Sequence, residues 1–419
     1  MPTADDFTKP VEWLPDVAYQ FAQMIRDWGE RRYRPLRRKI DEDWREHRLV
    51  EPLLKEALVD LGINKALWPS EYGGMDLPRE VLGTMTAVMS EELGKLDSGF
   101  AVSVLVSLWP MVMIAVEPHK NQRLIEEFAP KFCGEELYVG CNAMTEPQGG
   151  SDIENLEGMK GRTIRTTARL EGDEWVIRGH KLWPTNSGRM ADLFGVVCTT
   201  NPSAGEEGMA YIYVPADAEG VRVGEPYQKA GMAADMNTDI WFEDVRVPAH
   251  YRAHGPGLDA KYFRELITLA NIATAGFSVG VIKDTYEILK RWVDERVVAG
   301  KPLKEHSISA VNLSEIATAA EICTHSLYMA ARMYDHPEIY GEPWSEKLVA
   351  KTRAVSLFCS DQAVHCTNRA MELMGSYGYS REFDVEKHWR DSKMLTLWMG
   401  GRQLDMIEIT RYFFECKTL

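Results

Sequence analysis

Apolar and polar residues change their spacing twice along the chain. Over residues 11–136, apolar residues recur every three or four positions, which predicts helices. Over residues 137–252, short runs alternate apolar and polar residues between Gly, Asn and Asp clusters, which predicts a small antiparallel β-barrel or sandwich. Beyond Gly257 the helical spacing returns and continues to the C-terminus. The expected order is therefore helices, strands and helices again.

Long runs of helical spacing fill the last part of the chain. They cover Ala260–Arg296, Ile308–Tyr334, Glu346–Met374 and Asp384–Phe414. Each run combines charged positions with a broad apolar stripe, as expected of helices buried in a bundle. We therefore expect an α+β chain with a helical domain over residues 1–138, a β domain over 139–252 and a helical bundle over 253–419.

The segment Gly99–Val116 resembles a membrane span in length. It has 18 residues without a charge, about the minimum for a span. Pro110 interrupts it, and Asp97 and Glu117 flank it where Lys or Arg would be expected at a membrane. We interpret it as buried helix and expect no membrane span, with membrane contact as the alternative.

Charge and cysteine usage narrow the range of partners. The chain has 48 Lys and Arg against 63 Asp and Glu, a formal charge of −15. Nucleic acid is not expected as a partner, because proteins that bind it need a positive surface. The seven cysteines are odd in number, widely spread and without a C-x-x-C pair, so neither a disulfide framework nor a metal site is expected. The acidic N-terminus MPTADDFTKP lacks the features of an export signal, which indicates a cytoplasmic location.

A Gly-rich turn begins the β region, from Met144 to Asp152 (MTEPQGGSD). Its backbone N–H groups and the hydroxyls of Thr145 and Ser151 suit an anionic group or the acceptor edge of a heteroaromatic ring. The alternative is an ordinary turn between a helix and a strand.

A predicted strand ends in the segment from Gly179 to Gly188 (GHKLWPTNSG). The indole of Trp183 can cover one face of a flat cofactor, and the Thr185 hydroxyl, two residues on, points to the same side. The alternative is a structural tryptophan that closes the barrel.

Together with these two segments, six further motifs resemble the acyl-CoA dehydrogenase family over nearly the whole chain. They are Pro69–Met75 (PSEYGGM), Glu92–Ser98 (ELGKLDS), Phe242–Pro248 (FEDVRVP), Arg296 followed by Gly300–Leu303 (GKPL), Gly375–Gly378 (GSYG) and Arg390–Lys393 (RDSK). Each motif alone is weak, but eight in the family's order and spacing make the resemblance strong.

The resemblance implies a helical N-domain, a middle β domain and a C-terminal four-helix bundle. It also implies FAD between the β domain and the bundle, an acyl-CoA substrate, an electron-transfer flavoprotein as electron acceptor, and a homotetramer.

Residue roles follow from the resemblance as well. Thr145 would bond the pyrimidine end of the flavin, Trp183 would lie against the ring, and Thr185 would bond near N5. Ser151 would serve the pyrophosphate or the CoA arm, and Asn271 would line the CoA entrance. The adenine end would be held, in part across a subunit interface, by Arg296, Gly375, Ser376 and Gln403.

The carboxylate that takes the substrate's α-proton in this family is absent from both of its usual positions. Counting from Arg390 places Met399 where the family has its Glu, and a thioether cannot accept a proton. The backbone N–H of Met399 can still bond the thioester oxygen. The other position, on the first bundle helix, is Ala270. Glu265 lies five residues earlier and faces about 140° away on a helix.

Three interpretations of this absence stay open. In the first, the substrate carries its own carboxylate and is oxidised, with or without decarboxylation, while Arg402, Arg264 or Arg252 holds that carboxylate. Each of these arginines has a surface ion pair as its alternative role.

In the second, Asp97 acts as the base, with Glu91 and Glu92 as weaker candidates; the alternative for Asp97 is to cap the following helix. In the third, the chain is a lyase that removes a β-substituent such as sulfinate, or a non-catalytic FAD-binding subunit. We favour acyl-CoA oxidation of an unusual substrate.

Bulky apolar residues indicate the shape of the acyl pocket. Leu395, Leu397, Trp398 and Met399 occur in one short stretch, and Trp109 with Met113 would add to the same lining. Such a lining fits a ring or a branched acyl group better than a long linear chain, while ordinary bundle core is the alternative.

Overall fold

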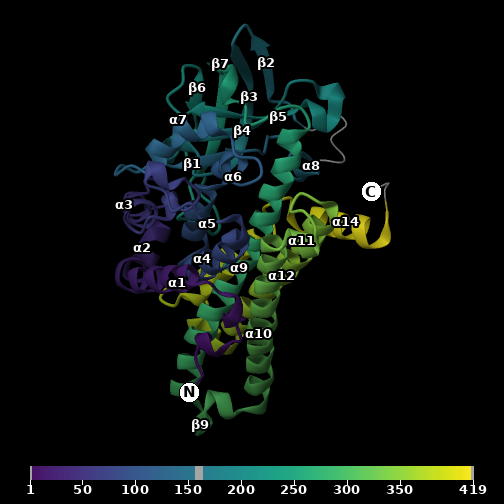
Figure 1. The fold of residues 1–419 in the computed structure, drawn as a ribbon. Coiled ribbons are helices and arrows are strands. Elements are labelled where there is room, and N and C mark those ends of the chain that lie inside the picture. Colours follow the sequence, from purple (N-terminus) through teal and green to yellow (C-terminus); the bar gives the residue numbers. More distant parts are fainter. Residues whose placement is uncertain (1, 156–163, 417–419) are drawn as a thin grey trace.

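The computed structural model describes residues 2–155 and 164–416 (Figure 1). A β domain lies at one end of the molecule and a long helical bundle at the other. The N-terminal helices pack beside the junction of the two. The predicted α+β class and the three-part order are confirmed.

The N-terminal region is helical, as predicted. Its helices are α1 (Asp16–Trp28), α2 (Arg37–Glu42), α3 (Val50–Lys55), α4 (Leu82–Leu96), α5 (Ser98–Val106), α6 (Trp109–Ala115) and α7 (Gln122–Phe132). Helix α4 packs closely on α9 of the bundle through glycine. A Cβ on Gly94 would lie 2.8 Å from the Cα of Phe277, so only glycine allows this approach.

The long apolar segment forms the core of the protein. It folds as α5 and α6, and the window Ser98–Ala115 is entirely buried inside the molecule. The helical run breaks just before Pro110, which occupies the first turn of α6, where its missing N–H costs least. A second apolar window, in α9, is also fully buried. Both windows therefore fit core helices, as the sequence predicted for the first.

The β domain forms one curled seven-stranded sheet in the order β1-β4-β2-β3-β7-β6, with β5 on the other edge of β4. The strands are β1 (Gly140–Ala143), β2 (Thr167–Glu171), β3 (Glu174–Thr185), β4 (Leu193–Thr199), β5 (Met209–Pro215), β6 (Val221–Val223) and β7 (Asn237–Pro248). The short helix α8 (Ser151–Glu154) follows β1.

The expectation of a purely antiparallel sheet was wrong at one edge. Strands β1 and β4 are parallel, and β2 also meets β4 in parallel at one residue pair. Parallel neighbours need a long crossover connection. Residues 144–192, which include β2 and β3, provide this connection between β1 and β4.

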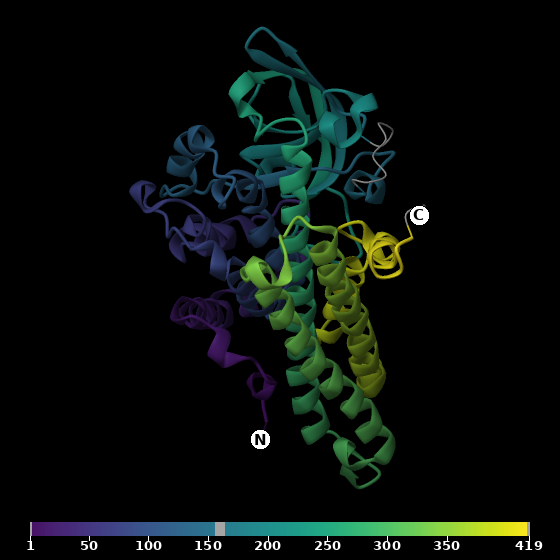
Figure 2. The same ribbon diagram turned by 45° about the vertical axis from the view of Figure 1, so that its right-hand side comes forward.

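The bundle is built around α9 (Leu258–Glu295), a helix of 38 residues. Its partners are α10 (Ser307–Asp335), α12 (Glu346–Met374), α13 (Val385–Leu395) and α14 (Gly401–Phe414), with the short α11 (Pro337–Tyr340) and the two-residue strands β8 (Val297–Val298) and β9 (Lys301–Pro302) in the connections. Helices α9, α10 and α12 run side by side (Figure 2).

The last predicted helix, Asp384–Phe414, is divided into α13 and α14. Three consecutive residues at the break have positive φ: Met399 at 52°, Gly400 at 82° and Gly401, the first residue of α14, at 66°. A helix cannot continue through such angles. The break directs Met399 towards the β domain, where it lines the cleft described below.

Candidate active site

A cleft of about 1280 Å³, including its open mouth, lies between the β domain and the bundle. It is lined by parts of α5 and α6, the turn after β1, the end of β3, and the loop between α13 and α14. The structure brings together six of the predicted site residues here: Thr145, Ser151, Trp183, Thr185, Trp398 and Met399.

Trp183 lies where β3 loses its regular pairing with β7. The register shifts between Leu182 and Thr185, and Trp183 itself has a φ of 68°. Its indole is turned out of the sheet and is 43% exposed. It stacks on Tyr227 with ring centroids 4.3 Å apart. The ring therefore stands at the wall of the cleft as a flat apolar surface.

Two hydroxyls border the same wall. Thr145 Oγ1 donates to the carbonyl oxygen of Leu182, and Thr185 Oγ1 donates to Asp235 Oδ2 over 3.3 Å. These bonds fix the positions of both threonine side chains at the end of β3. The hydroxyl oxygens remain able to accept hydrogen bonds from a ligand.

A buried lysine, which the sequence analysis missed, holds the Gly-rich turn against β3. Lys181 Nζ donates to the carbonyl oxygen of Met144 over 2.7 Å and to Glu146 Oε1 over 2.9 Å. Glu146 also accepts the backbone N–H groups of Arg165 and Thr166, each over 2.9 Å. Burial opposes the ionisation of Glu146, but Lys181 and Thr166 keep its pKa below the ordinary value.

The loop between α13 and α14 places the backbone of Met399 in the cleft. Arg353 Nη1, from α12, donates to the carbonyl oxygen of Met399 over 2.7 Å. The N–H of Met399 donates to no residue of the described chain. This free donor has the position that the resemblance gives to the group that bonds the thioester oxygen.

Two tryptophans close the inner end of the cleft. Trp109 and Trp398 are stacked, with ring centroids 5.6 Å apart and an interplanar angle of 25°. Behind Trp109 lies an apolar pocket of about 490 Å³, including its open mouth, lined mainly by Leu and Met side chains of α4 and of the segments around it. The indole of Trp109 borders both spaces and separates them.

Four of the six residues predicted to line the acyl pocket border this cleft. Trp109, Leu397, Trp398 and Met399 line the cleft. Leu395 and Met113 are buried in the core and do not border it.

Sequence profiles of the three acyl-CoA dehydrogenase domains match the chain in order: the N-terminal domain over residues 16–136, the middle domain over 141–245 and the C-terminal domain over 260–412. The chain belongs to the acyl-CoA dehydrogenase family. Members of this family are FAD-dependent oxidoreductases that act on CH–CH groups.

Individual relatives align over most of their length. The chain is 27% identical to cyclohexane-1-carbonyl-CoA dehydrogenase of Syntrophus aciditrophicus over 387 residues, which cover 92% of this chain and 94% of that one. Among solved structures it resembles butyryl-CoA dehydrogenase from Megasphaera elsdenii, with a TM-score of 0.82, 23% identity and coverage of 96% and 99%. It also resembles the glutaryl-coenzyme A dehydrogenase glutaryl-CoA complex, with a TM-score of 0.83, 20% identity and coverage of 96% of each chain.

The cleft fits the flavin that the acyl-CoA dehydrogenase family uses. The flat face of Trp183 and the hydroxyls of Thr145 and Thr185 lie on its lining, and such groups suit a flavin ring. Thr145, Trp183 and Thr185 would hold the ring. A bound flavin supplies the acceptor for a hydride.

The residues predicted for the adenine end of FAD do not reach this cleft. Arg296 follows α9 and lies over the ring of Tyr377, at 5.9 Å, beside the exposed Gly375 and Ser376. Arg296, Gly375 and Ser376 do not line the cleft. Gln403 is exposed on α14. Within one chain, the residues predicted for the adenine end of FAD therefore lie outside the cleft that Thr145, Trp183 and Thr185 line.

Asp97 does not line the cleft, because it caps α5. Its Oδ1 accepts the N–H groups of Gly99 and Phe100 over 2.8 and 3.1 Å. Lys387 Nζ lies 2.8 Å from its Oδ2. Burial opposes ionisation, but Lys387 and these N–H donors hold the pKa of Asp97 below its ordinary value. Asp97 therefore has the alternative role, that of a cap for the helix that follows it.

The other predicted acids are also bound elsewhere. Glu91 contacts Lys283 and Lys9 over 2.8 and 2.7 Å, and Glu92 pairs with Arg26 over 2.9 Å. None of these side chains lines the cleft.

The arginines proposed to hold a substrate carboxylate are paired as well. Arg402 is exposed and pairs with Asp361, Arg252 pairs with Asp259 over 2.6 Å, and Arg264 pairs with Glu206. Within the described residues, no arginine or lysine lines the cleft. Each arginine thus makes an ion pair, as its alternative role predicted, although the pair of Arg252 with Asp259 is largely buried and not at the surface.

Two residues of α9 face away from the cleft. Asn271 is buried and donates to Thr352 Oγ1 over 3.2 Å. Glu265 accepts the Tyr334 hydroxyl over 2.7 Å, and burial raises its pKa to about 7. Glu265 is therefore a poor substitute base, as its helical position predicted.

The sequence analysis missed a charged cluster behind Met399. Arg353 is fully buried and contacts Glu154 over 3.3 Å, Asp405 over 2.7 Å and Glu408. Burial raises the pKa of Glu154 to about 8 and that of Asp405 to about 6. One guanidinium faces three carboxylates, so the cluster retains protons near neutral pH.

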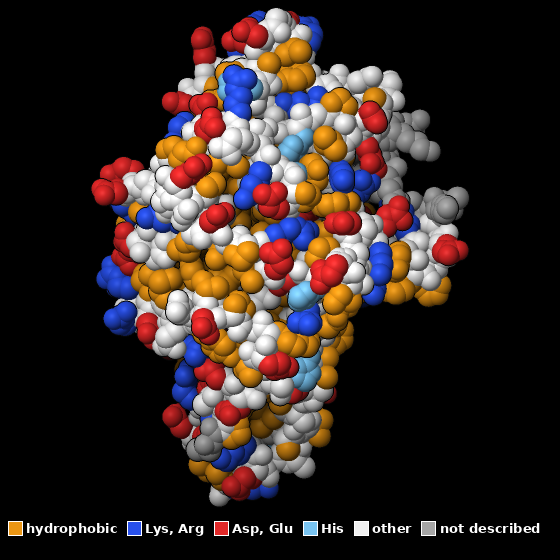
Figure 3. Space-filling model, viewed as in Figure 1, with side chains coloured by type: hydrophobic (Ala, Val, Ile, Leu, Met, Phe, Trp, Pro, Cys, Tyr) orange, Lys and Arg blue, Asp and Glu red, His pale blue; other side chains and the backbone are white. Residues whose placement is uncertain are grey.

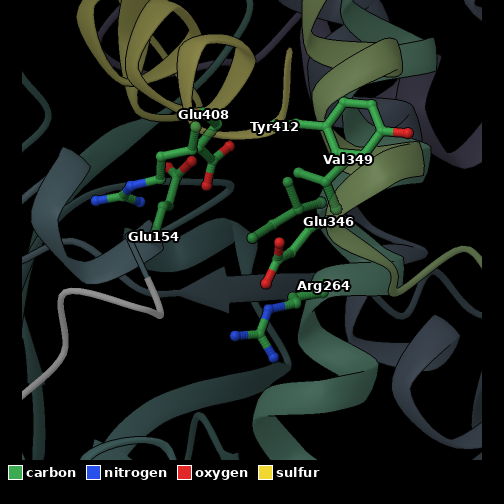
Figure 4. A pocket seen from close by; sticks show the side chains of 8 residues that line it. Glu154, Arg264, Glu346, Val349, Glu408 and Tyr412 are labelled. Atoms are coloured by element: carbon green, nitrogen blue, oxygen red, sulfur yellow. The ribbon is translucent and has the colours of Figure 1, made fainter. Parts of the chain in front are cut away.

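Glu154 belongs to this cluster and also lines two neighbouring hollows, the cleft and a second pocket. It lines the cleft together with Met399, and it also lines a neighbouring pocket between α9, α12 and α14. Figure 4 shows Glu154 beside Glu408 in that pocket, with Arg264 and Glu346 across from them. The signal available in the sequence was weak: an acid directly after the Gly-rich turn, and an arginine on a buried helix stripe.

Proposed function

We propose that the chain oxidises an acyl-CoA thioester at its α and β carbons with FAD, and that its acyl group is compact, as in a ring. The observation that carries the second part is the stacked pair of Trp109 and Trp398, two bulky side chains that line the cleft. A long linear chain would have to displace a buried indole. Similarity to a cyclohexane-1-carbonyl-CoA dehydrogenase supports the same class of substrate.

In this proposal, different residues of the cleft have different roles in the reaction. Thr145, Thr185 and Trp183 orient the flavin, and the Met399 N–H polarises the thioester carbonyl, which acidifies the α-hydrogen. Apolar side chains exclude water from the reacting carbons. The thioether of Met399 takes no part in proton transfer.

A carboxylate-bearing substrate has less support. A free carboxylate in the cleft would need a cation, and the described lining residues include none. We therefore do not propose oxidative decarboxylation of such a substrate. The experiment below tests for it.

The proposal includes an assembly, a location and an acceptor. Arg296, Gly375, Ser376 and Gln403 do not line the cleft of their own chain. A second copy, in a homotetramer, would supply them. Cytoplasmic location and reoxidation by an electron-transfer flavoprotein follow from the family resemblance. On the face shown in Figure 3, acidic and basic side chains are interspersed.

The test is anaerobic mixing of the FAD-loaded protein with cyclohexane-1-carbonyl-CoA, butyryl-CoA and glutaryl-CoA. We expect the flavin to bleach with the cyclic thioester and no CO₂ to appear. CO₂ release with glutaryl-CoA would show a carboxylate substrate. Product formation without bleaching would show a lyase, and a colourless protein that takes up no FAD would end the proposal.

A further inference from the structure

We infer that Glu154 is the catalytic base that takes the α-proton of the thioester, in place of the carboxylate absent at Met399 and Ala270. This inference rests on the proposed function and adds the group that the function lacks. It is drawn from the position of Glu154 in the cleft and from the contacts of the other acids.

The carboxylate of Glu154 lies directly beside the loop that carries the thioester-binding N–H. Glu154 ends α8, its side chain is buried, and it lines the cleft next to Met399 and Gly400. A Cβ on Gly400 would lie 3.0 Å from Glu154 Oε2. This oxygen is therefore within contact distance of the residue that follows Met399.

One guanidinium positions both groups. Arg353 donates to the carbonyl oxygen of Met399 over 2.7 Å and lies 3.3 Å from Glu154 Oε2. Because Arg353 is fully buried, both partners are held in a fixed relation. The other oxygen, Glu154 Oε1, makes no hydrogen bond to the described residues, which leaves it available to a substrate.

A comparison of the acids that line the cleft also identifies Glu154 as the base. In the described chain only Glu146 and Glu154 bring a carboxylate to the cleft lining. Both oxygens of Glu146 are occupied by Lys181 and two backbone N–H groups. Glu154 is the acid with an oxygen to spare.

The charges around Glu154 suit proton transfer near neutral pH. It faces Arg353 from α12 and Asp405 and Glu408 from α14, and its second pocket adds Arg264, Glu346 and Arg411. Burial raises its pKa to about 8. A base of this pKa matches the proton affinity that general base catalysis at neutral pH requires.

The reaction balances without any further reactant. The α C–H bond breaks and its proton passes to a Glu154 oxygen. The electron pair forms the Cα–Cβ double bond, while the β-hydrogen leaves with its own electron pair to the oxidised flavin of the proposed function. The products are the α,β-unsaturated thioester, reduced flavin and protonated Glu154.

The test separates proton transfer from oxidation. The full-length protein, with its flavin chemically reduced beforehand, is incubated with cyclohexane-1-carbonyl-CoA in D₂O, and deuterium at the α-carbon is followed by mass spectrometry. We expect Glu154→Gln to slow this exchange at least 100-fold, within the range of about 10²–10⁴ for a lost general base. Glu154→Asp should retain part of the rate.

Asp152→Asn is the matched control, because Asp152 lies two residues away on α8 and is exposed. It should exchange within twofold of the wild type. A second readout uses infrared spectroscopy of the cofactor-free protein. We expect the wild type to show a band of a protonated carboxyl group that titrates near pH 8, and Glu154→Gln to lack this band.

The possible results distinguish the two proposals. Wild-type exchange rates in a folded Glu154→Gln protein that still bleaches would overturn the role of Glu154 and leave the proposed function standing. Failure of the wild type to bleach or exchange with any of the three thioesters would overturn both.

Discussion

Arg353 and Met399 are joined by a hydrogen bond of 2.7 Å, from the guanidinium Nη1 to the carbonyl oxygen. The bond connects α12 with the loop between α13 and α14, 46 residues further along the chain. The positive φ of Met399 is maintained by this contact and by the two glycines that follow. A buried cation thus controls the shape of the loop that carries the thioester-binding N–H.

Replacing Arg353 by Met should destabilise the protein by about 3–5 kcal/mol, because three buried carboxylates lose their cation. Urea denaturation at pH 7.5 measures this loss. The loss should shrink at pH 5.5, where the carboxylates can protonate. Arg402→Met removes an exposed ion pair and should cost less than about 1 kcal/mol. Equal losses in the two variants would contradict the structural role of Arg353.

Stability should fall as pH rises from about 5 to 8. The native pKa of Glu154 is raised to about 8, above its ordinary value of 4.5. The native state therefore binds more protons than the unfolded state between these values, and it loses stability as pH rises through this window. Denaturant titrations at several pH values measure the slope. Glu154→Gln should flatten it, and an unchanged slope in that variant would show that Glu154 ionises freely.

Replacing Trp109 by a smaller residue should shift the substrate preference from cyclic towards linear acyl groups. Trp109→Val would join the cleft to the apolar pocket of about 490 Å³ behind it. We expect kcat/KM for octanoyl-CoA, relative to cyclohexane-1-carbonyl-CoA, to rise by about tenfold or more, the scale set by fitting extra methylenes. Met113→Ala, a buried change in the same helix away from both spaces, should lower stability without altering this ratio.

Lys181→Met should weaken flavin retention as well as stability. The variant leaves Glu146 buried without its cation and frees the carbonyl oxygen of Met144. A stability loss of about 3–5 kcal/mol is expected for breaking a buried pair from one side. The loosened Gly-rich turn should also raise the Kd for FAD, measured by fluorescence. Recovery of the wild-type Kd in the double variant with Glu146→Gln would separate the charge effect from a general loss of fold.

The sequence predicted those features that depend on neighbours in the chain. Trp183 and Thr185 were placed at one wall because residues two apart on a strand share a face. Both do line the cleft, although β3 loses its regular pairing between Leu182 and Thr185. Helix α5 and α6 could be recognised as core from their apolar run and acidic flanks. The absence of a base at Met399 was visible as soon as the spacing from Arg390 was counted.

Features that join distant segments could not be foreseen. Glu154 and Arg353 are 199 residues apart, and nothing in either local pattern shows that they meet. The parallel pairing of β1 and β4 depends on a crossover of some fifty residues. The position of Asp97 allowed two roles, and the structure decides for the cap: its Oδ1 accepts the N–H groups of Gly99 and Phe100, and its Oδ2 contacts Lys387 from a remote helix.

The length of α9 has a genetic consequence. At 1.5 Å per residue its 38 residues span about 57 Å, so the helix carries Arg296 to the end of the bundle away from the β domain. Under the proposed assembly, one chain's Arg296 serves the flavin of another copy. Glu154→Gln and Arg296→Ala chains, each inactive alone, would then complement each other when co-expressed, because a mixed assembly contains some sites with both residues intact.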